Sequence, residues 1–296
     1  MPKRRPVLVA IDHATDVERA IRAALGAADA SVADVHVIRV APHGAVDDRG
    51  PWPREGVRHV TLRGTAARVI PAYAQLTRAR VLVVERDYGT SRFWRHAGVV
   101  EDLARRSPVP ILVLPARPAH EGHPPRLRHI VTPVDFSLAA AVGLRTAVDL
   151  SRRHGARLTL VHALRAAPRD MVFSGGEAWD MIRSLPARVD AVAGRLRRAA
   201  SVFGADTVAT SVVTGAADGA ILDAATRSDA DMVVIGVPHR SWLDRIAFGS
   251  TLRRVLRRAT QPVLVVPVTA GAHPWSVIED HGTQARSASA VTRVAA

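Results

Sequence analysis

The chain contains two copies of one sequence pattern, and this repeat constrains the fold more than any other feature. Three pairs of positions recur at a constant offset of 151 residues: Gly64 with Gly215, Glu85 with Gly236, and Gly98 with Gly249. Earlier in the chain the offset is 123, as between Asp12 and Asp135, so the second copy has 28 more residues between two of its early strands. A duplication of this kind predicts two copies of one fold, and differences between the copies indicate where a binding site is kept or lost.

The composition is that of a globular protein. Its 296 residues allow two domains of ordinary size, and 48% apolar residues are enough for two cores. The apolar run after the basic start, Val7 to Ile11, is too short for a signal-peptide core or a membrane span, so we expect a cytoplasmic protein without membrane contact. With no cysteine, the chain has no disulfides, thiolate nucleophiles or thiolate metal sites.

The formal net charge of +14 raises the question of a nucleic-acid partner. Only Lys3 of the 41 basic residues is a lysine, and the arginines are spread along the chain. The densest group, Arg253, Arg254, Arg257 and Arg258, has the spacing of one solvated helix face. Because a basic patch supplies only the non-specific part of nucleic-acid binding, nucleic acid is the weakest of our three functional hypotheses.

Short β-branched runs that alternate with helical segments define the fold class. They predict parallel sheets covered on both faces, that is, two doubly wound α/β sheets of five strands in tandem. In the first copy the predicted strands are Val7–Ile11, Val35–Val40, Val57–Leu62, Val81–Val84 and Pro110–Leu114. In the second copy they are His129–Val134, Leu158–Ala163, Val208–Val213, Met232–Ile235 and Val263–Val266.

The extra residues of the second copy include an amphipathic segment, Trp179–Phe203, which we predict to be a crossover helix. The matching stretch of the first copy is rich in proline and glycine and predicts a loop, so the first domain lacks one crossover helix. We expect a degenerate domain at 1–116, a proline-rich linker at 117–127, a complete domain at 128–268 and a disordered tail at 269–296.

The richest candidate site follows the fourth strand of the second copy. That strand ends at Gly236, a loop follows, and Gly249 precedes Ser250 and Thr251 at the start of a helix. Glycines allow a phosphate to approach the backbone, the hydroxyl groups can donate hydrogen bonds, and a helix N-terminus presents unpaired N–H groups. This arrangement suits an anion, although a strand–loop–helix connection can also contain two glycines for turn geometry alone.

Neither a metal site nor catalytic residues are predicted. No histidine pair at ligand spacing has a third ligand nearby, and we expect His36, His59 and His162, in or beside strands, to be hydrogen-bonded polar residues near the sheet. No serine lies in a nucleophile elbow, and the repeat brings no acid pair together.

Three segments of the second copy resemble the universal stress protein family: Val131–Ser137 (VTPVDFS), Leu158–Ala163 (LTLVHA) and Gln261–Pro267 (QPVLVVP). The similarity covers residues 127–267 and, more faintly, 5–115, so the chain resembles a tandem member. The resemblance implies a Rossmann-like, adenine-nucleotide alpha hydrolase-like fold and a role in stress adaptation. In the nucleotide-binding branch of the family, ATP lies at the carboxyl ends of the strands, with Mg²⁺ bound through its phosphates.

Carried over by position, the family's nucleoside contacts fall on Asp135 and Ala163, with Pro133 shaping the turn. The phosphate contacts fall on four residues of the glycine loop and the helix after it: Gly236, Gly249, Ser250 and Thr251. The middle glycine of the family motif is replaced by His239, whose backbone tolerates positive φ and whose side chain either fills the phosphate space or donates to it. Arg240 follows and can help to neutralise phosphate.

The first copy departs further from the family pattern. It has Glu85 for Gly236, Tyr88 for His239 and Val99 for Ser250. A carboxylate at the phosphate-facing turn repels a nucleotide, and valine removes a hydroxyl donor. We therefore expect the first domain to be structural or interfacial and to bind no nucleotide.

The leading hypothesis is a tandem universal stress protein that binds ATP in its second domain as a regulatory ligand, with at most slow hydrolysis and no enzymatic function. The resemblance also implies that the domains pair through their last strands, as in a homodimer, and that two chains pair again. The alternative is a nucleotide-independent module that regulates a partner protein through its surfaces. Glu85, Val99 and His239 favour this alternative.

Overall fold

The computed structural model describes residues 5–11, 16–27, 35–41, 57–86, 99–115, 127–164, 176–238 and 249–268. The elements of the first half are β1 (Val7–Ile11), α1 (Val17–Ala27), β2 (Val35–Ala41), β3 (Val57–Arg63), α2 (Ala66–Thr77), β4 (Val81–Glu85), α3 (Val99–Arg106) and β5 (Ile111–Leu114). Those of the second half are β6 (His129–Pro133), α4 (Leu138–His154), β7 (Arg157–Leu164), α5 (Gly176–Val202), β8 (Ala209–Thr214), α6 (Ala217–Arg227), β9 (Met232–Val237), α7 (Gly249–Arg258) and β10 (Val263–Pro267).

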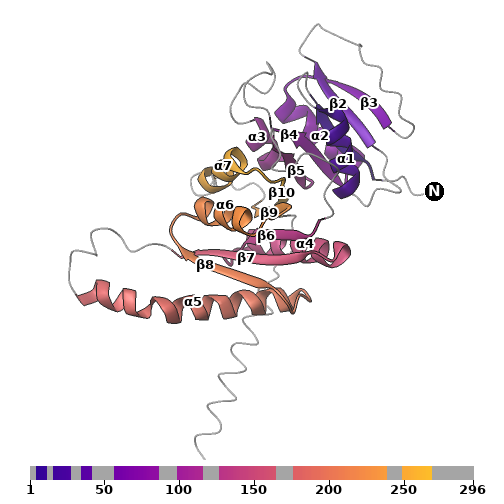
Figure 1. Cartoon of the computed structure of the whole chain (residues 1–296). Helices are drawn as coiled ribbons and strands as arrows, with labels where there is room; N and C mark the ends of the chain where they lie inside the picture. Colours follow the sequence, from indigo (N-terminus) through magenta and orange to yellow (C-terminus); the bar gives the residue numbers. More distant parts are fainter. Residues whose placement is uncertain are drawn as a thin grey trace, which may run out of the picture.

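The strands form one ten-stranded sheet with the order β3-β2-β1-β4-β5-β10-β9-β6-β7-β8. Within each half, neighbouring strands are parallel, and the order of strands on one side of the centre mirrors the order on the other. The predicted tandem of doubly wound five-stranded sheets is thus confirmed. Figure 1 shows the first domain (β1–β5) and the second domain (β6–β10) at opposite ends of the molecule.

The two domains meet where β5 and β10 pair in antiparallel fashion. The register places Val263 opposite Val113, Leu264 opposite Leu112, and Val265 opposite Ile111. The predicted pairing through the last strands is therefore confirmed within one chain. Because all strands of one domain run against those of the other, the carboxyl ends of the two half-sheets face opposite edges. A ligand at one carboxyl edge cannot reach the other.

Helices cover both faces of the sheet. On one face the apolar core contains residues of α2, α3, α6 and α7, such as Ile70, Leu103 and Leu256. On the other face it contains residues of α1, α4 and α5, such as Leu144 and Leu196. Strands covered on both sides are buried along their length, as the burial of β1 and β10 shows. Among the described residues, no helix has the length and apolarity needed to span a membrane.

The crossover helix predicted for the second domain is present as α5, which lies along the β8 end of the sheet in Figure 1. The matching stretch of the first domain, 42–56, lies outside the described residues, as do the predicted tail and all of the predicted linker except Leu127. Strand β3 alternates in exposure: Val60 and Leu62 are half-buried, whereas Thr61 and Arg63 are exposed. This pattern indicates that only one face of β3 is covered.

Helix α4 packs directly on the end of β9 through two glycines. A Cβ atom added to Gly236 would lie 1.7 Å from the carbonyl oxygen of Ala139, and one added to Gly143 would lie 2.6 Å from the backbone nitrogen of Gly236. Neither neighbour is a flexible side chain, so the contact requires glycine on both elements. The sequence predicted Gly236 as a site for phosphate approach, and the structure gives it a packing role as well.

This contact predicts that Gly143→Ala destabilises the protein by about 2 kcal/mol, because the new methyl group would push α4 off the strand. Gly219→Ala is the matched control: this glycine also lies in a helix, but a Cβ there meets nothing within 4 Å. The control should be neutral or stabilising by up to about 1 kcal/mol. Urea unfolding of the two variants measures the difference, and equal stability of both would contradict the packing role.

Candidate functional site

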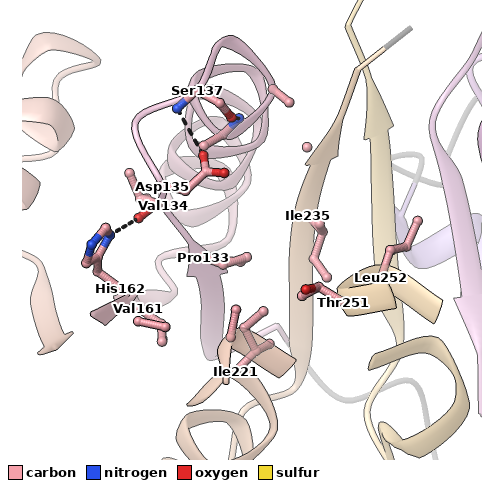
Figure 2. A pocket seen from close by; sticks show the side chains of 15 residues that line it. Pro133, Val134, Asp135, Ser137, Val161, His162, Ile221, Ile235, Thr251 and Leu252 are labelled. Atoms are coloured by element: carbon pink, nitrogen blue, oxygen red, sulfur yellow. Dashed lines mark hydrogen bonds between the residues drawn. The ribbon is translucent and has the colours of Figure 1, made fainter. Parts of the chain in front are cut away.

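A pocket opens at the carboxyl edge of the second domain, where β6 is flanked by β7 on one side and β9 on the other. The chain leaves β6 toward β7 and returns later to β9, which makes this crevice the topological switch point of the half-sheet. Its described lining, seen in Figure 2, consists of Pro133, Val134, Asp135, Ser137, Ala139, Ala140, Val161, His162, Ala163, Ala217, Ile221, Ile235, Gly236, Thr251 and Leu252.

The turn from β6 into α4 places a carboxylate at the pocket. Oδ1 of Asp135 accepts a hydrogen bond of 2.9 Å from the backbone N–H of Ser137, and Oγ of Ser137 caps α4 by accepting one of 3.1 Å from Ala140. Phe136 between them has φ of 63°, a left-handed conformation that is rare for an aromatic residue. The turn is therefore fixed by two side-chain hydrogen bonds, and Oδ2 of Asp135 can accept from a ligand hydroxyl group.

Strand β7 extends past the end of β6 and presents its backbone to the pocket. The last registered pair is Pro133 with Val161, and the Val161 carbonyl accepts a further hydrogen bond of 2.8 Å from the Val134 N–H. Backbone groups alternate along a strand, so the N–H and carbonyl of Ala163 point to the same side as those of Val161, where β6 has already ended. This geometry offers one donor and one acceptor to the edge of a planar ligand.

His162 lies between these two residues and ties β7 to the turn. Its Nδ1 is 2.6 Å from the Val134 carbonyl oxygen, as Figure 2 shows, and a carbonyl only accepts, so Nδ1 donates. Its ring lies 5.4 Å from the ring of Phe136, which in turn lies 4.0 Å from the guanidinium carbon of Arg195 on α5. The prediction that His162 is a hydrogen-bonded polar residue is confirmed. The same holds for buried His36, whose Nδ1 is 3.0 Å from the Tyr73 hydroxyl.

The opposite wall comes from β9, α6 and α7. In Figure 2, Ile235 and Thr251 lie across the pocket from the end of β6, and Ile221 lies below that end. Apolar side chains form most of this wall, and Thr251 adds one hydroxyl group in the first turn of α7. Unpaired N–H groups at the start of a helix favour an anion, so this wall combines an apolar surface with one anion-favouring end.

Five of the predicted site residues line this one pocket: Pro133, Asp135, Ala163, Gly236 and Thr251. Gly249 and Ser250 precede Thr251 in α7 and are not part of the described lining. His239 and Arg240 lie outside the described residues. The structure thus brings together residues from four separate segments of the sequence.

Ten of the fifteen lining residues were not among the predicted site residues, and two of these, Ala217 and Ile221, come from α6, a helix that sequence reasoning did not place at the site. The order of elements could have indicated α6, because a helix that follows a parallel strand begins at the carboxyl edge of the sheet, where the pocket lies. The cavity has a volume of about 200 Å³. This is below the ~300–1000 Å³ of pockets that enclose a whole drug-sized ligand. A nucleotide would therefore place only part of itself inside, and its remainder would extend along the rim.

The first domain has a carboxylate at the corresponding place. Glu85, which aligns with Gly236, accepts a hydrogen bond of 3.1 Å from the backbone N–H of Asp16 and is ion-paired with Arg19. Arg19 also donates to the Pro115 carbonyl at 3.0 Å. Burial raises the pKa of Glu85 above its ordinary value, while Arg19 and the Asp16 N–H act in the opposite direction.

The start of α1 explains how Glu85 fits. Asp16 caps this helix by accepting a hydrogen bond of 3.0 Å from the Arg19 N–H, whereas in the second domain Ser137 is the cap. By the offset of 123, Asp16 corresponds to Ala139, which lies inside the first turn of α4. Helix α1 therefore begins two residues later than α4. The Glu85 carboxylate accepts from the Asp16 N–H and so binds at the N-terminus of α1.

Comparison with known proteins agrees with this geometry. Residues 126–267 match the model of the Universal stress protein family. A universal stress protein of Methanocaldococcus jannaschii is 26% identical over 140 residues, which cover 47% of this chain and 81% of that protein. The second domain, residues 126–267, thus matches the universal stress protein family over its whole length.

Solved structures extend the likeness to both domains. A universal stress protein from Archaeoglobus fulgidus is similar with a TM-score of 0.60 at 15% identity, covering 90% of this chain and 98% of that chain. A putative universal stress protein from Pseudomonas aeruginosa gives a TM-score of 0.57 at 15% identity, covering 90% of this chain and 94% of that one. At 15% identity the likeness shows the fold alone. Because it extends over 90% of this chain, it includes both domains.

The environment of Glu85 predicts a pH dependence. A carboxyl group whose pKa is raised by folding stabilises the fold below its unfolded pKa, and this stability is lost as the pH rises through the folded value. The wild type should therefore lose stability relative to Glu85→Gln between pH of about 4 and about 7. Urea unfolding at both pH values gives the difference.

Glu18→Gln, which removes one carboxylate at an exposed position of the same helix α1, is the matched control. A wild type that instead gains stability over Glu85→Gln with rising pH would mean that the ion pair with Arg19 outweighs burial.

Proposed function

We propose that the second domain binds an adenine nucleotide, ATP with Mg²⁺ on its phosphates, and that this ligand regulates the protein in stress adaptation. The match of the second domain to the universal stress protein family supports the role in stress adaptation. The observation that carries the nucleotide proposal is the pocket at the switch point of the second half-sheet, lined by five residues that the family pattern selects.

The nucleoside side of this proposal is supported by β6 and β7. The Asp135 carboxylate, fixed through its Oδ1, can accept from a ribose hydroxyl group. The N–H and carbonyl of Ala163 point to the side where β6 has ended, so they can pair with the donor and acceptor edge of adenine. The apolar side chains of Ile221 and Ile235 suit the faces of a base.

The phosphate side is supported by α7. Thr251, in the first turn of α7, lines the pocket and offers a hydroxyl group, and the N–H groups at the start of a helix favour an anion. Mg²⁺ would be held mainly by the phosphates, which agrees with the preference of this ion for phosphate oxygens and water over protein side chains. Within the described residues, no group of acidic or histidine side chains forms a metal site of its own.

We propose regulation rather than catalysis as the use of the nucleotide. The described lining contains one carboxylate and one histidine, and that histidine donates its Nδ1 hydrogen to a backbone carbonyl. A ligand that contacts β6, β7, α6 and α7 together can favour one arrangement of these elements without any bond being broken. The first domain serves as a structural partner, because the Glu85 carboxylate fills the corresponding place and would repel phosphate.

Calorimetric titration of the full chain with ATP and Mg²⁺ tests the proposal. We expect one site per chain, and Asp135→Asn should weaken binding about tenfold or more, because an amide accepts a ribose hydrogen bond less strongly than a carboxylate. An Asn side chain keeps an oxygen that can accept from Ser137, so the turn is preserved. Asp149→Asn, an exposed position on α4, is the control for the charge change and should leave binding intact.

Absence of heat at millimolar ATP with folded protein would reject the nucleotide site. The nucleotide-independent interaction module would then be the remaining function, and its surfaces would have to be sought on both domains. Equal loss in Asp135→Asn and Asp149→Asn would place the ligand outside the pocket.

A further inference from the structure

An ion pair that the family pattern did not select joins α6 to α7, next in sequence to residues that line the pocket. Asp218, only 5% exposed, is the second residue of α6 and directly follows Ala217, which lines the pocket. Its Oδ2 lies 3.0 Å from Nε of Arg254 and 3.8 Å from Nη1 of Arg258, both on α7. Its Oδ1 is buried and has no hydrogen-bond donor among the described residues.

Arg254 lies close to the pocket because of where α7 begins. It follows Thr251, which lines the pocket, by three residues and so lies on the same helix face. Side chains of a helix lean toward its N-terminus, so the Arg254 side chain covers the turn that contains Thr251. The contact with Asp218 through Nε holds the guanidinium at the level of the first turn of α6 and leaves the Nη groups for other acceptors.

Stability alone gives a weak reason for this pair. Apolar residues already join α6 and α7 on the core side, among them Ile221, Leu252 and Leu256. A buried carboxylate with one oxygen lacking a donor is costly. The side chains of Arg254 and Arg258 are 49% and 65% exposed, so solvent screens their attraction to Asp218 and the pairs contribute little to stability. An incompletely satisfied charge that fixes an arginine at a pocket rim is better explained by a ligand that uses the arginine.

We propose that Arg254 binds the outer phosphates of the nucleotide as they leave the pocket over the first turn of α7, and that Asp218 is the positioning residue that holds it there. The inference rests on the proposed nucleotide site and deepens it, because it makes the site select nucleoside di- and triphosphates over the nucleoside. Guanidinium groups form strong, directional hydrogen bonds to phosphate oxygens.

The first domain lacks both members of the pair. By the offset of 151, Asp218 corresponds to Ala67. Along α3 and α7 the offset is 152, because the Ser107 N–H donates to the Leu103 carbonyl as the Ala259 N–H donates to that of Val255. Arg254 therefore corresponds to Asp102, which is an acid. The pair is thus confined to the domain in which the pocket and Thr251 are present. The shared fold does not require the ion pair, since the first domain forms without it. Its presence in the second domain alone is expected if the pair contributes to ligand binding.

The test compares ATP and adenosine in calorimetric titrations of the full chain. Arg254→Gln should weaken ATP binding about tenfold and leave adenosine affinity within about twofold, since only the phosphates lose a partner. Arg253→Gln, exposed on the same helix and equal in charge change, is the matched control and should keep both affinities. Asp218→Asn should weaken ATP binding in the wild-type background but have no further effect in Arg254→Gln, because it acts through the arginine.

Each other outcome overturns the inference in a distinguishable way. Equal weakening of ATP and adenosine by Arg254→Gln would assign the pair a structural role, which the melting temperature of the variant would also report. Equal weakening of ATP by Arg253→Gln and Arg254→Gln would mean a general effect of positive charge. If the wild type binds adenosine as tightly as ATP, the inference is wrong but the nucleotide site stands. If the wild type binds neither ligand, both the inference and the proposed function are wrong.

Discussion

The arrangement of the second domain depends on the close contact between Gly143 of α4 and Gly236 of β9. Because neither residue has a side chain, the first turn of α4 lies directly on the end of the strand, where the Ala139 carbonyl approaches the Gly236 backbone. That position of α4 fixes the turn before it, and with it the Asp135 carboxylate and the capping Ser137. The walls of the pocket thus follow from a backbone contact between a helix and a strand.

The same position has the opposite effect in the first domain. Glu85 replaces the glycine, α1 begins later than α4, and the carboxylate binds the N-terminus of the shortened helix together with Arg19. The residue at the end of the fourth strand therefore differs in role between the domains: Gly236 packs against α4 and lines the pocket, whereas Glu85 is held by the Asp16 N–H and Arg19. The antiparallel pairing of β5 and β10 joins the two in one sheet with their carboxyl edges facing opposite ways. The first domain supports the second without sharing its site.

Much of this fold could be predicted from the sequence, because buried parallel strands are continuous apolar runs. Strand Val7–Ile11 was predicted to the residue, and α5 within three residues at its N-terminal end. The pairing of β5 with β10 was implied by the family resemblance, and the register of the two strands confirms it within one chain. The later start of α1 was not predictable, because it depends on where the Glu85 side chain lies in space.

The candidate site was predictable only in part. Family resemblance selected Asp135, Ala163 and Thr251, which the structure places around one pocket. It assigned Gly236 to phosphate approach, whereas only the packed structure reveals the contact with α4. The pairing of Asp218 with Arg254 joins residues on two helices, and no spacing in the sequence indicates it.

A crystal structure of the full chain grown with ATP and Mg²⁺ tests the central claim most directly. The account predicts nucleotide density in the second domain alone, with the ribose beside Asp135 and the phosphates over the first turn of α7, while Glu85 keeps its contact with Arg19. An empty second-domain pocket at saturating ATP, or a nucleotide in place of the Glu85 carboxylate, would contradict it.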